Sequence, residues 1–93
     1  MLKKYLVTCW IEEKFSAGKI LKREEVQSYV ANFWIKETEE SEFRFDFETE
    51  KGQKQALDLI FNQLTKQIEL RQLKNLSINH IALLSWKEIK YED

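Results

Sequence analysis

The chain of 93 residues contains no proline, two glycines, one cysteine and one histidine. A lone cysteine, Cys9, excludes an internal disulfide and a metal cluster built from cysteines, which fits a reducing compartment. Gly18 and Gly52 stand far apart, so the sequence has no glycine-rich phosphate loop. No apolar run approaches the ~20 residues of a membrane span, and the N-terminal run lacks a cleavage signature. We therefore expect a cytoplasmic protein without a cofactor or a membrane partner.

The charges are almost balanced, with 15 basic and 16 acidic residues and a net charge of −1. Nucleic-acid binding by bulk electrostatics needs a positive surface, so the balanced charge argues against nucleic-acid binding of this kind. Lysines outnumber arginines twelve to three, which suits an AT-rich genome of bacterial or phage origin. The length predicts a single domain over residues 1–93 with one modest core.

The clearest pattern is the run Glu-Phe-Arg-Phe-Asp-Phe-Glu over residues 42–48. Successive side chains on a strand point to opposite faces. The run therefore predicts a strand with an apolar face of Phe43, Phe45 and Phe47 and a charged opposite face.

Three further elements have clear signals. Residues 4–12 are rich in β-branched and aromatic types on both faces, which predicts an internal strand. Residues 51–72 predict an amphipathic helix, with Thr49 as its N-cap and Asn75 as its stop. Its apolar stripe consists of Leu57, Ile60, Phe61, Leu64 and Ile68. Residues 76–86 predict a last strand, which can continue through Ile89 and Tyr91. One of its faces is formed by Leu76, Ile78, His80, Ala82, Leu84 and Trp86.

Residues 22–36 fit two structures. Val26, Tyr29, Val30, Phe33 and Trp34 follow the spacing of a helix face. Tyr29 and Phe33 also belong to an alternating pattern, and the composition suits a strand. The helical spacing, with Glu24 and Glu25 in a first turn, favours a helix.

These elements predict the α+β class. We expect a small two-layer sandwich in which the long helix, about 51–72, packs on a three- or four-stranded sheet. A second helix, about 22–36, would lie in the same layer as the long helix, on one face of the sheet. The phenylalanines of the 42–48 strand would then lie in the core under the long helix.

The residue types exclude several kinds of chemistry. One histidine and one cysteine cannot supply the converging ligands of a zinc site. Cys9 and His80 are the one pair that can form a thiol nucleophile and its base. Both lie on partly apolar strand faces, so we interpret Cys9 as a small core residue and His80 as a partly buried sheet residue with a local partner. We expect no catalytic residue, and we predict that the protein is not an enzyme.

The acidic stretch is the strongest functional signal. Glu37 to Glu50 contains seven acidic residues and one basic residue, Arg44. Such a charged surface suits docking to a basic partner, although a charged strand face also serves simply to keep an edge solvated. The predicted partner-binding residues are Glu39, Glu40, Glu42, Asp46 and Glu48.

Tryptophans indicate a second surface. Trp10 and Trp86 would lie together on the sheet face away from the long helix, and tryptophan is enriched at interfaces. Self-association through these two residues would give a homodimer, unless residues 22–36 cover that face.

The functional hypothesis is therefore a small non-enzymatic protein-interaction module, a regulator or inhibitor that presents its acidic strand face to a basic partner. The alternative is an accessory protein that binds nucleic acid through the lysine-rich loop and helix. Its lysines and arginines include Lys14, Lys19, Lys22, Lys54 and Arg71.

Overall fold

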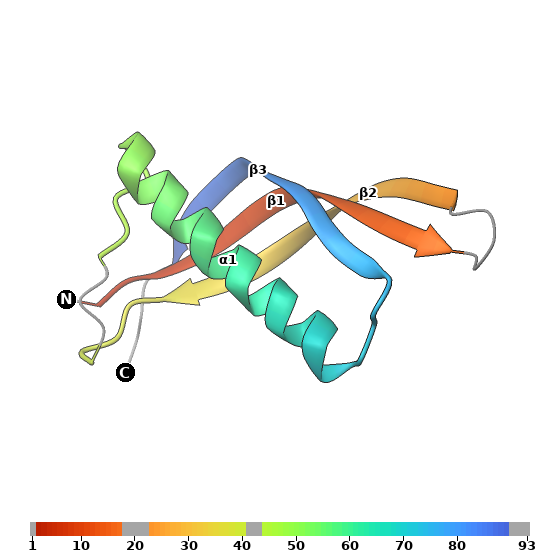
Figure 1. Cartoon of the computed structure of the whole chain (residues 1–93). Coiled ribbons are helices and arrows are strands. Elements are labelled where there is room, and N and C mark those ends of the chain that lie inside the picture. The colour runs from red at the N-terminus through yellow and green to blue at the C-terminus, as the bar shows by residue number, and fades with distance from the viewer. Residues whose placement is uncertain (1, 18–22, 41–43, 90–93) are drawn as a thin grey trace.

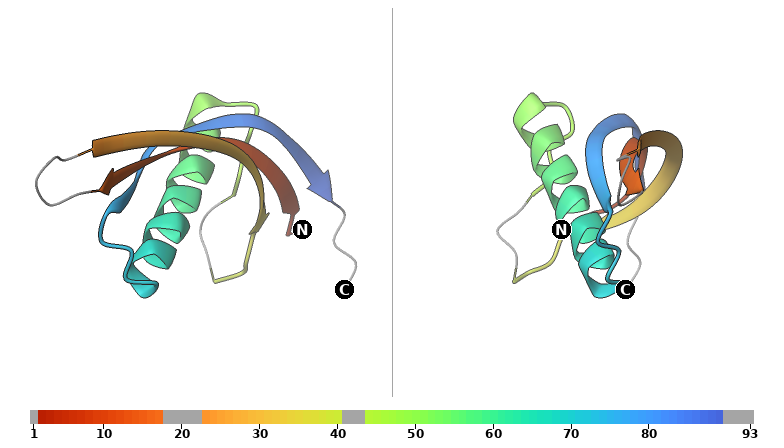
Figure 2. Two further views of the ribbon diagram at one scale, coloured as in Figure 1. Left: turned by 90° about the vertical axis from the view of Figure 1, so that its right-hand side faces the viewer. Right: turned by 45° about the vertical axis from the view of Figure 1, so that its right-hand side comes forward.

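The computed structural model describes residues 2–17, 23–40 and 44–89 (Figure 1). In chain order its elements are β1 (Lys4–Ala17), β2 (Arg23–Lys36), α1 (Glu50–Leu70) and β3 (Leu76–Ile89). The three strands form one antiparallel sheet in the order β2-β1-β3. α1 crosses one face of this sheet, the inner face, and leaves the outer face open in the described part of the chain (Figure 2). The predicted α+β fold is confirmed with one helix.

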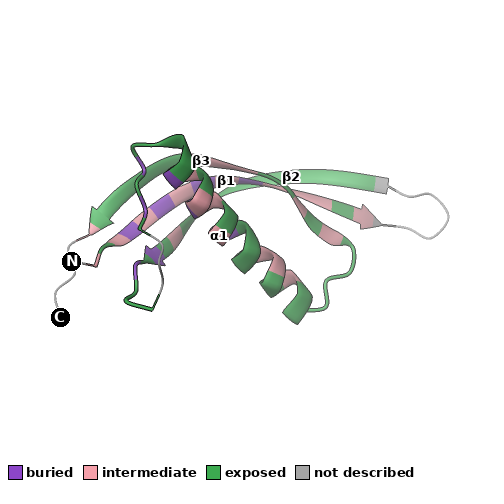
Figure 3. Cartoon of the chain, turned by 60° about the vertical axis from the view of Figure 1, so that its left-hand side comes forward, coloured by how far each residue is buried: buried purple, intermediate pink, exposed green. Residues whose placement is uncertain are grey.

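The core lies on the inner face of β1, the central strand. Alternate residues of β1 are buried there, namely Tyr5, Val7, Cys9 and Ile11. The same cluster contains buried side chains from β2, from the loop before the helix and from α1: Ile35, Phe45, Phe47, Ala56 and Ile60 (Figure 3). The interior position that the sequence predicts for residues 4–12 is therefore confirmed.

Residues 23–36 form a strand, so the predicted second helix is wrong. Every residue of β2 pairs with β1, from Arg23 opposite Ala17 to Lys36 opposite Lys4. Helical and alternating patterns coincide at Tyr29 and Phe33, so local spacing does not decide between them. The β-branched and aromatic composition was the better signal, because it suits the pairing with β1 that fixes the structure.

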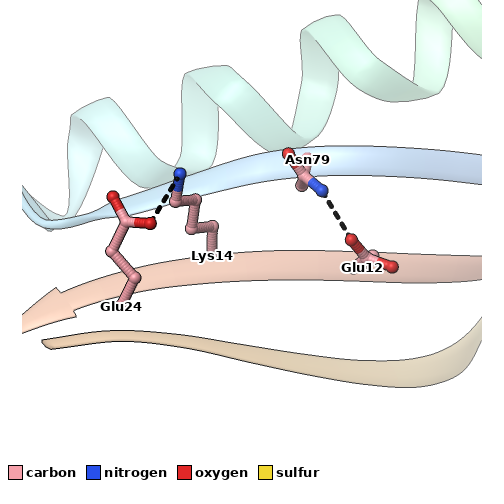
Figure 4. A network of polar contacts seen from close by, with 4 residues as sticks. All are labelled: Glu12, Lys14, Glu24 and Asn79. Carbon is pink, nitrogen blue, oxygen red and sulfur yellow. Dashed lines mark hydrogen bonds and ion pairs between the residues drawn. The ribbon is translucent and has the colours of Figure 1, made fainter.

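The strand predicted over residues 76–86 is confirmed as β3, but its predicted alternation is wrong in the middle of the strand. Leu76, Ile78 and Trp86 share one face as predicted, whereas His80 and Ala82 lie on the other. The register with β1 shifts twice, leaving Asn79 and Leu84 without a place opposite β1. A bulge changes the phase of the alternation by one residue. The shift at Asn79 therefore turns His80 to the outer face, and the shift at Leu84 returns Trp86 to the inner face, opposite Val7. The Asn79 side chain donates a hydrogen bond to Glu12 on β1 (Figure 4).

The predicted long helix is confirmed as α1, and Thr49 is its N-cap. Thr49 Oγ1 accepts a hydrogen bond from the N–H of Gly52 at 3.1 Å. The helix ends at Leu70, before the predicted stop at Asn75. The turn that follows has Gln72 in the left-handed region, at φ 55°.

The buried stripe of α1 is narrower than the predicted one. Gly52, Ala56 and Ile60 are buried at intervals of four residues, while Phe61 is 43% exposed. Gly52 is needed because a Cβ atom there would lie 1.8 Å from the carbonyl oxygen of Asp46. Because Gly52 has no side chain, the start of α1 can lie directly against the loop that precedes it.

Candidate functional site

Residues 44–48 form a loop rather than the predicted strand. Their burial nevertheless alternates as predicted: Phe45 and Phe47 are buried, and Asp46 and Glu48 are exposed. Glu42 and Phe43 lie outside the described residues. We call residues 37–40 and 44–49 the acidic loop. Its exposed carboxylates belong to Glu39, Glu40, Asp46 and Glu48.

Side chains provide the hydrogen bonds that a neighbouring strand would otherwise provide to the acidic loop. The Phe45 N–H donates to Glu37 Oε2 at 3.0 Å, and the Phe45 carbonyl accepts from the Tyr5 hydroxyl at 3.3 Å. The Phe47 carbonyl accepts from Gln53 Nε2 at 2.7 Å. Because these backbone groups have partners, the loop can alternate in and out without belonging to the sheet.

The turn into α1 is held in the same way. The carbonyl of Asp46 accepts from Thr49 Oγ1 at 3.0 Å and from the Thr49 N–H at 3.2 Å. Asp46 Oδ1 accepts from the N–H of Glu48 at 3.1 Å. The two carboxylates of Asp46 and Glu48 are thus presented by a defined turn rather than by a free chain.

Glu37 anchors the acidic loop and is only 3% exposed. One carboxylate oxygen accepts from the Lys3 N–H at 3.0 Å, and the other accepts from Phe45. The Glu37 N–H donates to the Lys3 carbonyl at 2.9 Å. In the sequence Glu37 stands out only as part of the acidic run. The signal of its role is that it lies two residues after Ile35, so a strand that continues to Glu37 points both side chains to the same inner face.

Aromatic rings fix the other side of the loop. Phe47 stacks on Trp86 at a centroid distance of 5.4 Å and meets Tyr5 edge-on at 4.8 Å. Burial, with Glu37 as a second cause, raises the pKa of Tyr5 above its usual value. Through its stacking on Phe47, Trp86 supports the acidic loop from the inner face of the sheet.

The predicted pairing of Trp10 with Trp86 on one surface is not found. Trp10 lies opposite Ala82 on the outer face and meets the ring of His80 at 5.8 Å. Trp86 lies on the inner face, because the bulge at Leu84 changes the alternation of β3.

Cys9 and His80 cannot act as a nucleophile and base together. Cys9 is fully buried on the inner face, and burial raises the pKa of its thiol. His80 is exposed on the outer face, opposite Glu12. The sheet separates the two side chains. Cys9 has the core role that the sequence favours, whereas His80 is exposed rather than partly buried as expected.

A small pocket opens beside the acidic loop, between Phe45 and α1. Its volume is about 210 Å³, and it is lined by Phe45, Gln55, Asp58, Leu59 and Asn62. Phe45 and Leu59 give it apolar walls, and the exposed Asp58 carboxylate lies at its rim. Apolar walls with an acidic rim suit the aliphatic stem and charged end of a lysine or arginine side chain. Sequence reasoning did not find this pocket, because it joins residues from two separate segments.

A larger apolar groove lies at the other end of α1. It has a volume of about 520 Å³ and lies between the last turns of the helix and the start of β3. Phe61, Ile68, Leu73 and Ile78 are among its lining residues. The groove accounts for the exposure of Phe61 and Leu73.

Tyr29 and Glu13 form a polar pair near the far end of the inner face. The Tyr29 hydroxyl donates to Glu13 Oε1 at 2.8 Å. Burial, together with this hydrogen bond and the Glu13 charge, raises the pKa of Tyr29 from 10.0 to about 12.

The raised pKa of Tyr29 gives a testable pH dependence. In the unfolded chain Tyr29 ionises near pH 10, so its contribution to stability is complete below that pH and is lost between about pH 10 and pH 12. We expect Glu13→Gln to lower the pKa of Tyr29 toward its ordinary value, which a titration of tyrosinate absorbance against the wild type measures. An unchanged titration curve would contradict the Glu13 contact.

The predicted nucleic-acid surface is only partly within the described residues. Lys19 and Lys22 lie outside them, and Lys14 forms an ion pair with Glu24 at 3.1 Å (Figure 4). The lysines on α1 are exposed but share the helix with Asp58 and Glu69. No continuous basic patch is therefore assigned on α1.

Within residues 2–17, 23–40 and 44–89, no group of three or more His, Cys, Asp or Glu side chains converges to hold a metal ion. None of the helical segments in that part of the chain is long and apolar enough to cross a membrane. Comparisons of the chain with family models, with curated proteins and with solved structures found no match.

Proposed function

We propose that this chain is a small non-enzymatic protein-interaction module that docks the basic surface of a partner protein on its acidic loop. The observation that carries this proposal is the anchoring of the loop. Glu37, Phe45 and Phe47 are buried, while Asp46 and Glu48 project from the same short segment. A merely solvated charge run needs no such anchoring.

Anchoring matters for affinity because binding costs conformational entropy. A loop that is already ordered loses less freedom when a partner binds, so more of the electrostatic attraction remains as binding free energy. Complementary charge also raises the rate of encounter and disfavours acidic competitors. The acidic loop combines both properties.

The pocket beside Phe45 adds specificity to the proposed docking. A lysine or arginine of the partner would place its aliphatic stem between Phe45 and Leu59 and its charge near Asp58. Charge at the loop would select a basic surface, and the pocket would select one residue on it.

The test is partner capture from the native host with variants of matched charge. We expect Glu39→Lys combined with Glu48→Lys to lower the amount of captured partner by about tenfold or more, because like charges would then face the basic surface. The control combines Glu69→Lys with Gln63→Lys and Gln67→Lys, which changes the net charge equally at exposed sites on α1 away from the loop. Equal capture by the two variants would contradict the proposal.

The same variants separate the proposal from the alternative function. An accessory protein that binds DNA or RNA through its lysines would give a gel shift that weakens steeply with salt. Both variants add positive charge, so both would strengthen such a shift. That result, with no captured protein, would replace the proposed docking function.

A further inference from the structure

β2 is an edge strand without the usual protection of an edge. It is the outermost strand in the order β2-β1-β3, and its register with β1 runs without a shift. β3, the other edge, carries two bulges, which disrupt pairing with a further strand. Residues 28–35 of β2 include no charged residue and no proline. A long regular edge of this kind pairs readily with another strand.

The side chains of β2 are also the least covered in the sheet. Val26, Val30 and Trp34 on the outer face are 58%, 59% and 53% exposed. Figure 3 shows exposed residues along most of this strand. The outer face of β2 therefore presents a strip of exposed apolar side chains along the edge of the sheet.

We propose that the free edge of β2 pairs antiparallel with β2 of a second copy of this chain. A two-fold axis would pass through the strand pair and join two three-stranded sheets into one of six strands. The interface lies on the edge strand and does not include the acidic loop. It therefore goes beyond the proposed docking function and can be tested independently.

Charge selects one register for this pair. Residues that lie opposite each other in antiparallel strands point to the same face of the sheet. Inner-face residues of one copy therefore lie opposite inner-face residues of the other, and the register can change only in steps of two residues. With Val30 on the axis, Glu24 of each copy lies opposite Lys36 of the other. The next pairs inward are Val26 with Trp34 and Ser28 with Asn32.

In the neighbouring registers Glu24 and Lys36 no longer lie opposite each other. A shift of two residues places either Glu24 opposite Trp34 or Lys36 opposite Val26. The register centred on Val30 therefore gives two ion pairs at its ends. It also brings the exposed apolar side chains of the outer face, Val26, Val30 and Trp34, into contact with those of the second copy. Glu24, which already pairs with Lys14 of its own chain (Figure 4), would lie between two lysines.

The first test is the mass of the protein in solution, measured by sedimentation. We expect the wild type to have twice the mass of the 11.3-kDa chain. Val30→Lys places two like charges on the axis and should give a monomer, while its circular dichroism stays that of the wild type because the side chain is exposed. Leu84→Lys, at an equally exposed site on β3, should leave the dimer intact. A monomeric wild type, or a dimer that survives Val30→Lys, would overturn the proposal.

The second test addresses the register and does not depend on Val30. Glu24→Lys and Lys36→Glu should each weaken the dimer by about tenfold, because symmetry creates two like-charge contacts. Combining both substitutions restores opposite charges across the axis, so we expect the double variant to recover the wild-type dissociation constant. Further weakening in the double variant would contradict this register.

Discussion

The Ile60→Ala variant is expected to unfold with a free energy about 4 kcal/mol below that of the wild type. Ile60 is fully buried in the middle of α1 and belongs to the cluster formed with Val7, Cys9 and Ile11 of β1. Removing its side chain leaves a cavity that a rigid sheet cannot fill by collapse. For a domain of this size, such a loss is a large share of the total stability.

Urea denaturation of the variant and the wild type measures this difference. Phe61→Ala provides the matched control, because Phe61 is the next residue on α1 and is 43% exposed. We expect the control to lose about 1 kcal/mol or less. Equal losses at the two positions would mean that α1 does not lie against the sheet in the described orientation.

The Glu37→Ala variant is expected to lose about 3 kcal/mol of stability and to weaken binding of the partner. The substitution removes both acceptors for the N–H groups of Lys3 and Phe45, and a buried donor without a partner costs about 1–3 kcal/mol. The exposed carboxylates of Asp46 and Glu48 remain, but the loop that presents them is released. Reduced affinity in this variant would therefore arise from loss of order rather than loss of charge.

Glu37→Gln separates the two effects of this substitution. Glutamine keeps the shape of the side chain and one oxygen acceptor, but its amide group cannot accept from the second N–H. We expect a loss of stability between those of the wild type and Glu37→Ala, measured by the same denaturation. A partner affinity that is unchanged in Glu37→Ala would show that anchoring contributes nothing to docking.

Local sequence patterns predict the elements in which apolar residues recur at the regular spacing of a helix or a strand. α1 was evident from its apolar spacing and from Thr49, and the internal position of β1 from apolar residues on both of its faces. The in-and-out alternation at Phe45 and Phe47 was also correct, although it occurs in a loop. Burial alternates there because side chains such as Glu37 and Gln53 hold the backbone of Phe45 and Phe47 by hydrogen bonds.

Long-range pairing determines what local patterns missed. β2 fits helix and strand equally at Tyr29 and Phe33, and its contact with β1 decides the structure. The bulges of β3 have no decisive sequence signal, because Leu84 is an ordinary strand residue and Asn79, a type uncommon in strands, also occurs at regular positions. As a result His80 and Ala82, which plain alternation places beside Ile78 and Trp86, lie on the opposite face. The pocket at Phe45 and Asp58 likewise has no local sequence signal, because it forms only where the acidic loop lies against α1.

The docking surface is tested most directly by amide hydrogen exchange of the chain, alone and with the captured partner. The proposed function predicts slower exchange in the complex at residues 38–40 and 44–49, and at the turn of α1 that carries Asp58. Exchange at the last turns of α1, beside the apolar groove, should remain unchanged. Protection confined to that groove or to the outer face of the sheet, with the acidic loop unaffected, would contradict it.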